Sequence, residues 1–177
     1  MQQLTCPIPA NINPLQSNGF LFGIQKLPEI SFFCQEATLP DLQAPAAEMD
    51  TPLVTVPMPG EKVSFGELTV TFLIDEGMNN YVAVHNWMVG LGFPESHDQY
   101  KNFISSRINL LNGSELIAGY SDGTLQILNS SNNPTRTVRF IDLFPTSLQQ
   151  LTLQSTTQDT TYLAATATFR YTTYRFE

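Results

Sequence analysis

The segment Glu95-Ser96-His97-Asp98 holds a carboxylate, a hydroxyl and an imidazole within four residues. These are the groups that nucleophilic and acid-base catalysis use. Catalytic groups normally come from separate elements that converge in space, whereas neighbours along the chain rarely meet at one point. We therefore interpret this segment as a polar surface loop after a helix, and an enzyme is the weaker alternative.

Imidazole and thiol groups are scarce in this chain. Two histidines limit both metal sites and acid-base catalysis, because most such sites need an imidazole that titrates near neutral pH. His85 falls in a predicted helix beside Trp87 and is expected to be packed or to cap that helix. Cys6 and Cys34 lack the spacing of zinc and redox motifs. We expect two unlinked thiols, with one disulfide that ties down the N-terminal residues as the alternative.

Other charged motifs can also be explained without a bound ligand. Asp75-Glu76 precedes a predicted helix, where it could bind a cation or accept the free N–H groups of the first turn. Capping needs no ligand and is preferred. Gly60-Glu61-Lys62 precedes a predicted strand, not a helix, and no phosphate-binding glycine pattern occurs. We expect no catalytic residue, no metal ligand and no cofactor.

The last strand mixes basic and aromatic residues. Arg170 and Arg175 alternate with Tyr171 and Tyr174, an arrangement that can stack single-stranded nucleic acid. The chain carries 16 acidic and 8 basic residues, a net charge of -8, which argues against gripping phosphates. An exposed strand face at an interface is therefore the preferred interpretation.

Composition and length indicate a single domain with large uncharged polar surfaces. The 177 residues suit one domain, and only 14% of them are charged, compared with about 25% in typical soluble domains. Residues 1–17 include Pro7, Pro9 and Pro14 and are predicted to form an extended arm, followed by one domain over residues 18–177. The chain shows no membrane-spanning apolar run and no signal-peptide pattern, so we expect it to be made and kept in a cytoplasm.

Short apolar runs predict strands in the first half of the chain. Residues 20–27 and 30–39 are predicted to form a β-hairpin around the turn at residues 26–29. The Pro-rich stretch 41–60 is predicted to be a long extended loop with an edge strand at 53–58, a kind of segment that often reaches another subunit. Residues 62–75 alternate with period two and form the clearest predicted strand.

The second half is predicted to add helix and further strands. Apolar spacings of three and four predict an amphipathic helix over residues 78–91, and 98–108 could form a second short one. Asp122-Gly123 predicts a tight hairpin turn between strands at 116–119 and 124–128. Residues 135–143 form a strand that Pro145 ends, and 162–176 form one long closing strand. The fold class is mainly β, an antiparallel β-sandwich or barrel with one flanking α-helix.

The stretches SFFCQEATLP at residues 31–40 and PGEKVSFGELTVTFLIDEGMNNYVAVHNWMVGLGFP at 59–94 resemble the tube-protein family of contractile-tailed phages. That family has an aromatic strand ending in Leu-Pro, here Leu39-Pro40, and a strand reaching an acidic pair, here Asp75-Glu76. A helix with a central Trp follows, here Trp87. The resemblance extends in order from about Phe20 to Phe176.

This resemblance implies a structural protein of the phage virion, not an enzyme. It implies subunits that pair their sheets side by side into a closed, usually hexameric ring, and rings that stack into a conduit through which DNA passes without specific binding. The implied partners are further copies, other tail tube proteins, and baseplate and sheath proteins, assembled in the host cytoplasm. An acidic lumen would repel a passing phosphate backbone.

Several alternatives stay open at this point. The Pro-rich arm departs from the main tube subunit, and the run at residues 79–94 looks closer to tube-initiating baseplate proteins; a tube-end terminator is a third position. A tube subunit of a related bacterial contractile secretion system would share the fold. A small-ligand or carbohydrate-binding β-sandwich is the last alternative, with exposed aromatics lining a groove, such as Tyr100, Tyr120 and Tyr174.

Overall fold

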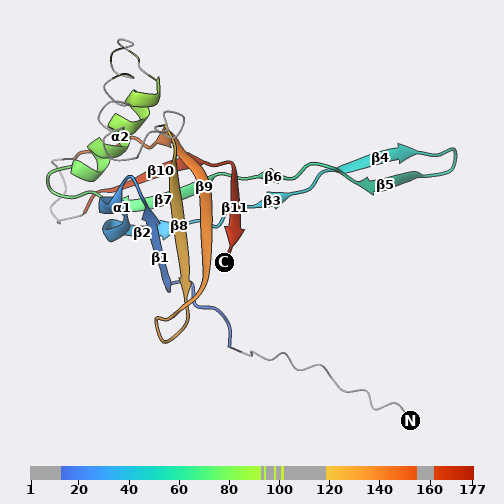
Figure 1. Ribbon diagram of the computed structural model, residues 1–177, viewed down its shortest axis with the longest axis horizontal. Coiled ribbons are helices and arrows are strands. Elements are labelled where there is room, and N and C mark those ends of the chain that lie inside the picture. Colours follow the sequence, from blue (N-terminus) through green and yellow to red (C-terminus); the bar gives the residue numbers. More distant parts are fainter. Residues whose placement is uncertain (1–12, 93, 95–97, 99–100, 102–118, 155–161) are drawn as a thin grey trace.

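The computed structural model describes residues 13–92, 94, 98, 101, 119–154 and 162–177, and this part of the chain is mainly antiparallel β-sheet (Figure 1). Seven strands form one sheet in the order β1-β8-β9-β10-β7-β2, with β11 paired to β9. Their bounds are β1 Phe20–Ile24, β2 Cys34–Ala37, β7 Leu68–Leu73, β8 Ser121–Leu128, β9 Pro134–Leu148, β10 Ala164–Arg170 and β11 Thr173–Phe176. The predicted fold class is confirmed.

Strand β9 connects the two layers of the sheet. Its first half pairs with β8 and β11, and its second half pairs with β10. Asp142 has a φ of 57° and the β9–β10 register shifts beside Pro145, so the strand bends between its two sets of partners. Strands β8 and β9 cross over β7 and β10 in Figure 1. The prediction that Pro145 ends this strand is wrong, because a proline is tolerated next to a bulge.

The core lies between these crossing layers. Leu68, Val70 and Phe72 of β7 are fully buried, as the period of two predicted. Val138 and Phe140 of β9, with Phe169 of β10, complete the centre of the cluster, and Ala165 and Ala167 are buried beside them. Burying each large apolar side chain stabilises the fold by about 1.5–3 kcal/mol.

Helix α2, Asn79–Gly92, covers one side of the sheet and confirms the predicted helix. Its buried face includes Val84 and Trp87. The Trp87 indole packs at 6.3 Å from the Phe169 ring, and its Nε1–H donates to the Gly119 carbonyl at 2.9 Å. The Lys26 ammonium lies 5.1 Å from the Trp87 ring. One aromatic residue therefore holds the helix against the sheet.

The predicted hairpin over residues 20–39 is wrong. Helix α1, Pro28–Phe33, separates β1 from β2, and these strands pair with β8 and β7 instead of each other. Pro28 stands in the first helical turn, where its fixed φ favours a helix and its missing N–H costs nothing. Glu29 complements the helix dipole, and Ile30 is buried in the core.

One turn lies elsewhere than predicted, and one predicted strand is two strands. Asp122-Gly123 lies inside β8, and the β8–β9 turn instead uses residues 129–133, where Asn129 Oδ1 accepts from the N–H groups of Ser131 and Asn133 at 2.9 and 3.0 Å. The predicted closing strand at 162–176 is two strands, β10 and β11, because they pair with different halves of β9. The predicted helix at 98–108 and strand at 116–119 lie largely outside the described residues.

The Pro-rich stretch forms two thin ribbons. Strands β3 Leu42–Gln43 and β6 Ser64–Phe65 make a stem, and β4 Ala46–Asp50 and β5 Thr55–Pro59 make a hairpin beyond it. The hairpin projects far from the sheet (Figure 1). The prediction that this stretch is extended and not helical is confirmed, whereas the single edge strand predicted at 53–58 is instead β5, which is paired with β4. Residues 13–16 form no helix or strand and are exposed, whereas residues 1–12 of the predicted arm lie outside the described part.

Candidate assembly surfaces

Strand β1 leaves one edge of the sheet open. It hydrogen-bonds only to β8 among the strands of the described chain. The Leu128 N–H donates to the Gly19 carbonyl at 2.8 Å, and the Gln25 N–H donates to the Asp122 carbonyl at 3.1 Å. In an antiparallel pair, the backbone N–H and C=O groups of every second residue point to the partner strand, so those of the odd-numbered residues of β1 point to β8. The backbone groups of Phe20 and Phe22 therefore point to the open edge.

Strand β11 leaves a second open edge on the other side of the same four strands, β1-β8-β9-β11. Glu177 and Thr137 exchange both backbone hydrogen bonds, at 2.8 and 3.1 Å. By the same alternation, the backbone groups of Tyr174 and Phe176 point away from β9. Phe176 also leaves 56% of its surface exposed. An open strand edge is a template for pairing with another chain.

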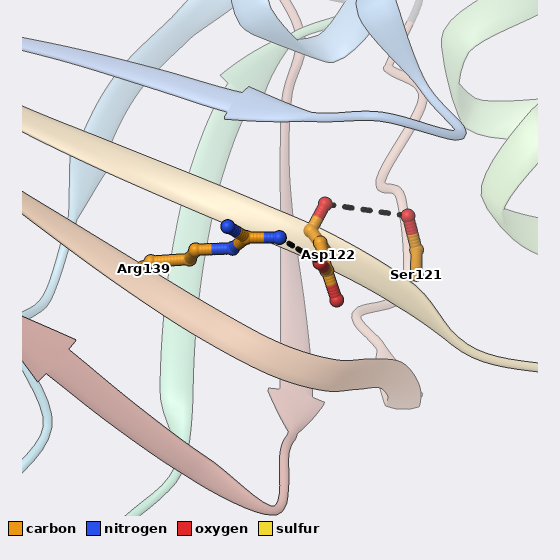
Figure 2. Close-up of polar contacts among 3 residues, drawn as sticks. All are labelled: Ser121, Asp122 and Arg139. Atoms are coloured by element: carbon orange, nitrogen blue, oxygen red, sulfur yellow. Dashed lines mark hydrogen bonds and ion pairs between the residues drawn. The ribbon is translucent and has the colours of Figure 1, made fainter.

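The outer face of these four strands carries charges of both signs. The Arg139 guanidinium donates to Asp122 Oδ2 at 2.8 Å, and Ser121 Oγ donates to the Asp122 carbonyl at 3.3 Å (Figure 2). The Asp122 carboxylate raises the pKa of Arg139. Arg175 of β11 lies directly opposite Arg139 in the register. Thr124, opposite Arg139 on its other side, is uncharged.

The hairpin β4–β5 is apolar, acidic and without contact to the sheet in the described chain. Its turn is closed by Thr51, whose hydroxyl donates to the Val54 carbonyl and accepts from the Val54 N–H. Leu53 at the tip is 97% exposed and Val54 is 62% exposed. A two-stranded hairpin is at best marginally stable in water, so exposed apolar side chains here call for a partner.

The stem joins the hairpin to the sheet through aromatic contacts. Phe65 packs edge-on against Tyr171 and Tyr174, with ring centroids 6.1 and 5.4 Å apart. The Tyr171 hydroxyl is buried without a hydrogen-bond partner among the described residues, and burial raises the pKa of Tyr171 to about 12. Beyond the stem, the Gly60 N–H donates to the Pro45 carbonyl at 2.9 Å. These contacts set the direction in which the hairpin leaves the domain.

Asp75, the first residue of the acidic pair before α2, caps the helix, as preferred from the sequence. Asp75 Oδ1 accepts from the Asn80 N–H at 3.1 Å, and Asp75 Oδ2 accepts from the Asn79 side chain at 2.8 Å. The backbone bond from Asn80 is the main reason that the pKa of Asp75 is lowered. Glu76 is exposed. No group of metal-binding side chains occurs among the residues that the structure describes.

We expect Asp75→Asn to destabilise the protein at neutral pH and to lose this effect in acid. A carboxylate with a lowered pKa in the folded state contributes stability above its unfolded pKa, and the contribution is lost as pH falls through the folded pKa. Thermal midpoints of the native and Asp75→Asn proteins should therefore differ at pH 7 and converge below pH about 4. Glu76→Gln is the control, and an Asp75 difference that does not change with pH would contradict the capping role.

The remaining candidates for chemistry do not form a site in the described residues. His85 is exposed on α2, so the expectation that it is packed is wrong. Asp98 forms an exposed pair with Lys101 at 3.5 Å, and Glu95, Ser96 and His97 lie outside the described residues. A surface pair of this kind contributes little stability.

Cys34 and the two arginines near the C-terminus also form no site in the described residues. Cys34 forms no disulfide with any described residue, its S–H lies 3.6 Å from the Glu36 carbonyl, and burial raises the pKa of Cys34 to about 11. Cys6 lies outside the described part. Arg170 donates to Glu67 at 3.0 Å, and Arg175 is exposed.

The described tyrosines that could have stacked nucleic acid or lined a groove pack against other aromatic rings of the domain. Tyr171 and Tyr174 turn inward onto Phe140, away from the arginines. Tyr120 packs edge-on against Phe144 at 5.5 Å. Tyr100 lies outside the described residues. The open edges at β1 and β11 were not found from the sequence, because only long-range pairing reveals which strands are left at the sides of a sheet.

A model of the phage tail tube protein family matches residues 3–177. The chain belongs to this family. The family consists of structural tube proteins and not of enzymes, which confirms both the resemblance and the expectation of a non-enzymatic protein.

Solved structures share the fold of this tail tube protein. The anti-feeding prophage cap, a tube-terminating cap, superposes with a TM-score of 0.63 at 16% identity, covering 99% of both chains. A chain of the anti-feeding prophage baseplate gives 0.58 at 15% identity, covering 93% of this chain and 96% of the other. A chain of a sheath-tube complex from an extracellular contractile injection system gives 0.57 at 16% identity, covering 94% and 93%. No curated protein sequence matches.

In the described ranges, no helix combines the length and the apolar character needed to cross a bilayer.

Proposed function

We propose that this protein forms a closed ring of the phage tail tube, or of the tube's end at the baseplate, and that the ring lines the conduit for DNA ejection. The observation that supports ring formation is the pair of open edges, β1 and β11, on opposite sides of four hydrogen-bonded strands. The two edges differ, so a contact between them is head-to-tail, and such contacts close into rings or continue as filaments. The family resemblance implies six subunits.

The packing of the domain decides which face of the sheet would line the bore. Strands β7 and β10 and helix α2 all lie on the inner, apolar side of the four strands. If the four strands of every subunit enclose the bore, these layers cannot fit inside it. They therefore form the outer side of the ring. The face with Thr124, Arg139 and Asp122 then faces the DNA. In place of an acidic lumen, we propose a lining in which Arg139 is paired with Asp122, and this pairing disfavours tight binding of phosphates.

The hairpin β4–β5 supports stacking of rings. It extends away from the sheet (Figure 1), and all five residues of each of its strands are exposed. We propose that it reaches a copy in the adjacent ring or a baseplate protein, where its apolar side chains would be buried. Sheath proteins would surround the tube, and the assembly would form in the host cytoplasm before it is part of the virion tail.

Gly60→Ala should uncouple stacking from folding. A Cβ at Gly60 would lie 2.1 Å from the Pro45 carbonyl oxygen, so the backbone at the base of the hairpin must move. We expect rings without tubes in electron micrographs, with the thermal midpoint nearly unchanged because the core is remote. Gly92→Ala, where nothing lies within 4 Å, is the matched control. Normal tubes from Gly60→Ala would argue against a stacking role for the hairpin.

A second candidate is a tube or cap component of a related contractile injection system. The proteins with similar folds include a tube-terminating cap and a sheath-tube component, which motivates this candidate. It shares the proposed ring and differs in the machine that the ring serves. Neighbouring genes for capsid and packaging proteins would favour the phage tail.

Negative-stain electron microscopy across a concentration series, with mass measured in parallel, tests the proposed function. We expect closed rings or stacked tubes at high concentration. Rings that never stack would indicate an end piece of the tube. A monomer at every concentration, also after addition of the baseplate proteins, would contradict the proposal.

A further inference from the structure

A groove with apolar walls opens where α1, the end of β7 and the start of α2 meet. Its volume is about 660 Å³, within the range of sites that hold several side chains of a partner. Apolar residues form its walls: Phe33, Leu73, Ile74, Met78 and Leu163. The elements that line the groove, α1 and the start of α2, lie on the opposite side of the domain from the hairpin β4–β5 and from β11 (Figure 1).

Large aromatic side chains are exposed at this groove. Tyr162, which also lines it, is 83% exposed. Phe32 is 84% exposed and contacts the groove residue Phe33 edge-on at 5.0 Å. Exposed aromatics beside an apolar depression are typical of binding hot spots, where burial of a few large side chains supplies most of the affinity.

The rim of the groove is negatively charged. Asp75 and Glu76 both line it. Asp75 is held by the first turn of α2, whereas Glu76 is exposed and makes no ion pair within the described residues. An apolar groove with a carboxylate at its rim is complementary to an apolar side chain that is flanked by Lys or Arg.

The same charge argues against a hairpin from a second copy as the occupant. Residues 27–61 contain six acidic residues and no basic one. Two of these, Glu48 and Asp50, flank the exposed tip of the hairpin. Docking that tip beside Glu76 would bring like charges together, which opposes binding. The groove therefore suits a basic segment and not this acidic hairpin.

We propose that this groove is a docking site for a basic, apolar segment of another protein, which inserts an apolar side chain and places Lys or Arg against Glu76. The site requires neither the ring nor the tube, because every residue that forms it comes from one chain. The docking site would form a contact surface on the side of the subunit that is opposite the hairpin β4–β5 and β11.

The test uses the full chain and a fluorescent amphipathic peptide composed of Leu and Lys, with fluorescence anisotropy as the readout. We expect saturable binding, and no binding of the matching peptide composed of Leu and Glu. Glu76→Lys should weaken binding at least about tenfold, since like charges across an interface cost several kcal/mol. Tyr162→Ala should also weaken it about tenfold. Both side chains are exposed, so circular dichroism should show an unchanged fold.

Matched controls separate the groove from general attraction to an acidic protein. Glu48→Lys makes the same change in net charge on the hairpin and should leave peptide affinity within about twofold. Equal loss from Glu48→Lys and Glu76→Lys would overturn the proposal. A second outcome would also overturn it: no peptide binding, together with self-association that Tyr162→Ala and Leu53→Ala weaken alike, would assign the groove to a contact between copies.

Discussion

Replacing Trp87 with alanine is expected to lower the free energy of unfolding by about 3–5 kcal/mol. Trp87 is 1% exposed and joins α2 to the Phe169 ring on the sheet. Its removal leaves a cavity between helix and sheet, and the Gly119 carbonyl loses the indole N–H that donates to it at 2.9 Å. Chemical denaturation followed by circular dichroism measures the loss, and the thermal midpoint should fall by roughly 6–20 °C.

Two variants on the same helix complete this test. Trp87→Phe keeps most of the buried volume but lacks the indole N–H, and should cost about 1–3 kcal/mol. Val82→Ala changes a side chain that is 45% exposed and should stay within about 0.5 kcal/mol of the native protein. If Trp87→Ala were no worse than Val82→Ala, α2 would not be docked through this residue.

Phe176→Pro is expected to abolish rings without unfolding the subunit. The Phe176 N–H points away from β9, so a proline there leaves the β9 ladder intact and removes a donor only from the open edge. In the proposed ring, β11 pairs with β1 of the adjacent subunit. The proline would leave a carbonyl of that β1 unpaired, which costs about 1–3 kcal/mol at each contact between subunits. Each contact should therefore weaken about five- to 140-fold. Electron microscopy and mass measurement across a concentration series would show monomers.

Phe176→Ala is the control for this variant. It removes the same aromatic side chain and keeps the N–H, so it should still form rings, at a higher protein concentration. The thermal midpoints of the two variants should agree within a few degrees, since Phe176, which both variants replace, does not belong to the fully buried core. Rings from Phe176→Pro as abundant as those from Phe176→Ala would show that β11 does not pair across the subunit interface.

Patterns that repeat within a few residues predicted most of the regular elements correctly. The period of two in residues 68–72 and 165–169 identified strands with one buried face, and that face is buried. Spacings of three and four identified α2, and Asp75 caps it. These predictions succeed because the signal lies in which side chains of one segment share a face, which does not depend on the rest of the chain.

Predictions that depended on a partner strand failed more often. Asp122-Gly123 has the residues of a tight turn, yet it lies in β8, where the backbone bonds of two neighbouring strands outweigh local turn preference. Pro145 lies within β9 because a bulge accommodates it. The aromatic run after Pro28 begins as a helix because Ile30 is buried there.

The amino-acid sequence by itself determined the class of the fold, the extended stretch at 41–60, the helix α2 and membership of the tail tube family. Tertiary structure alone decided which strands stand at the sides of the sheet, that Tyr171 and Tyr174 turn inward while Arg175 stays outside, and that an apolar groove with an acidic rim lies beside α1. The reason is physical: an open edge, a cross-strand pair or a groove is defined by residues distant in sequence, and their pairing is set by the packing of the whole core.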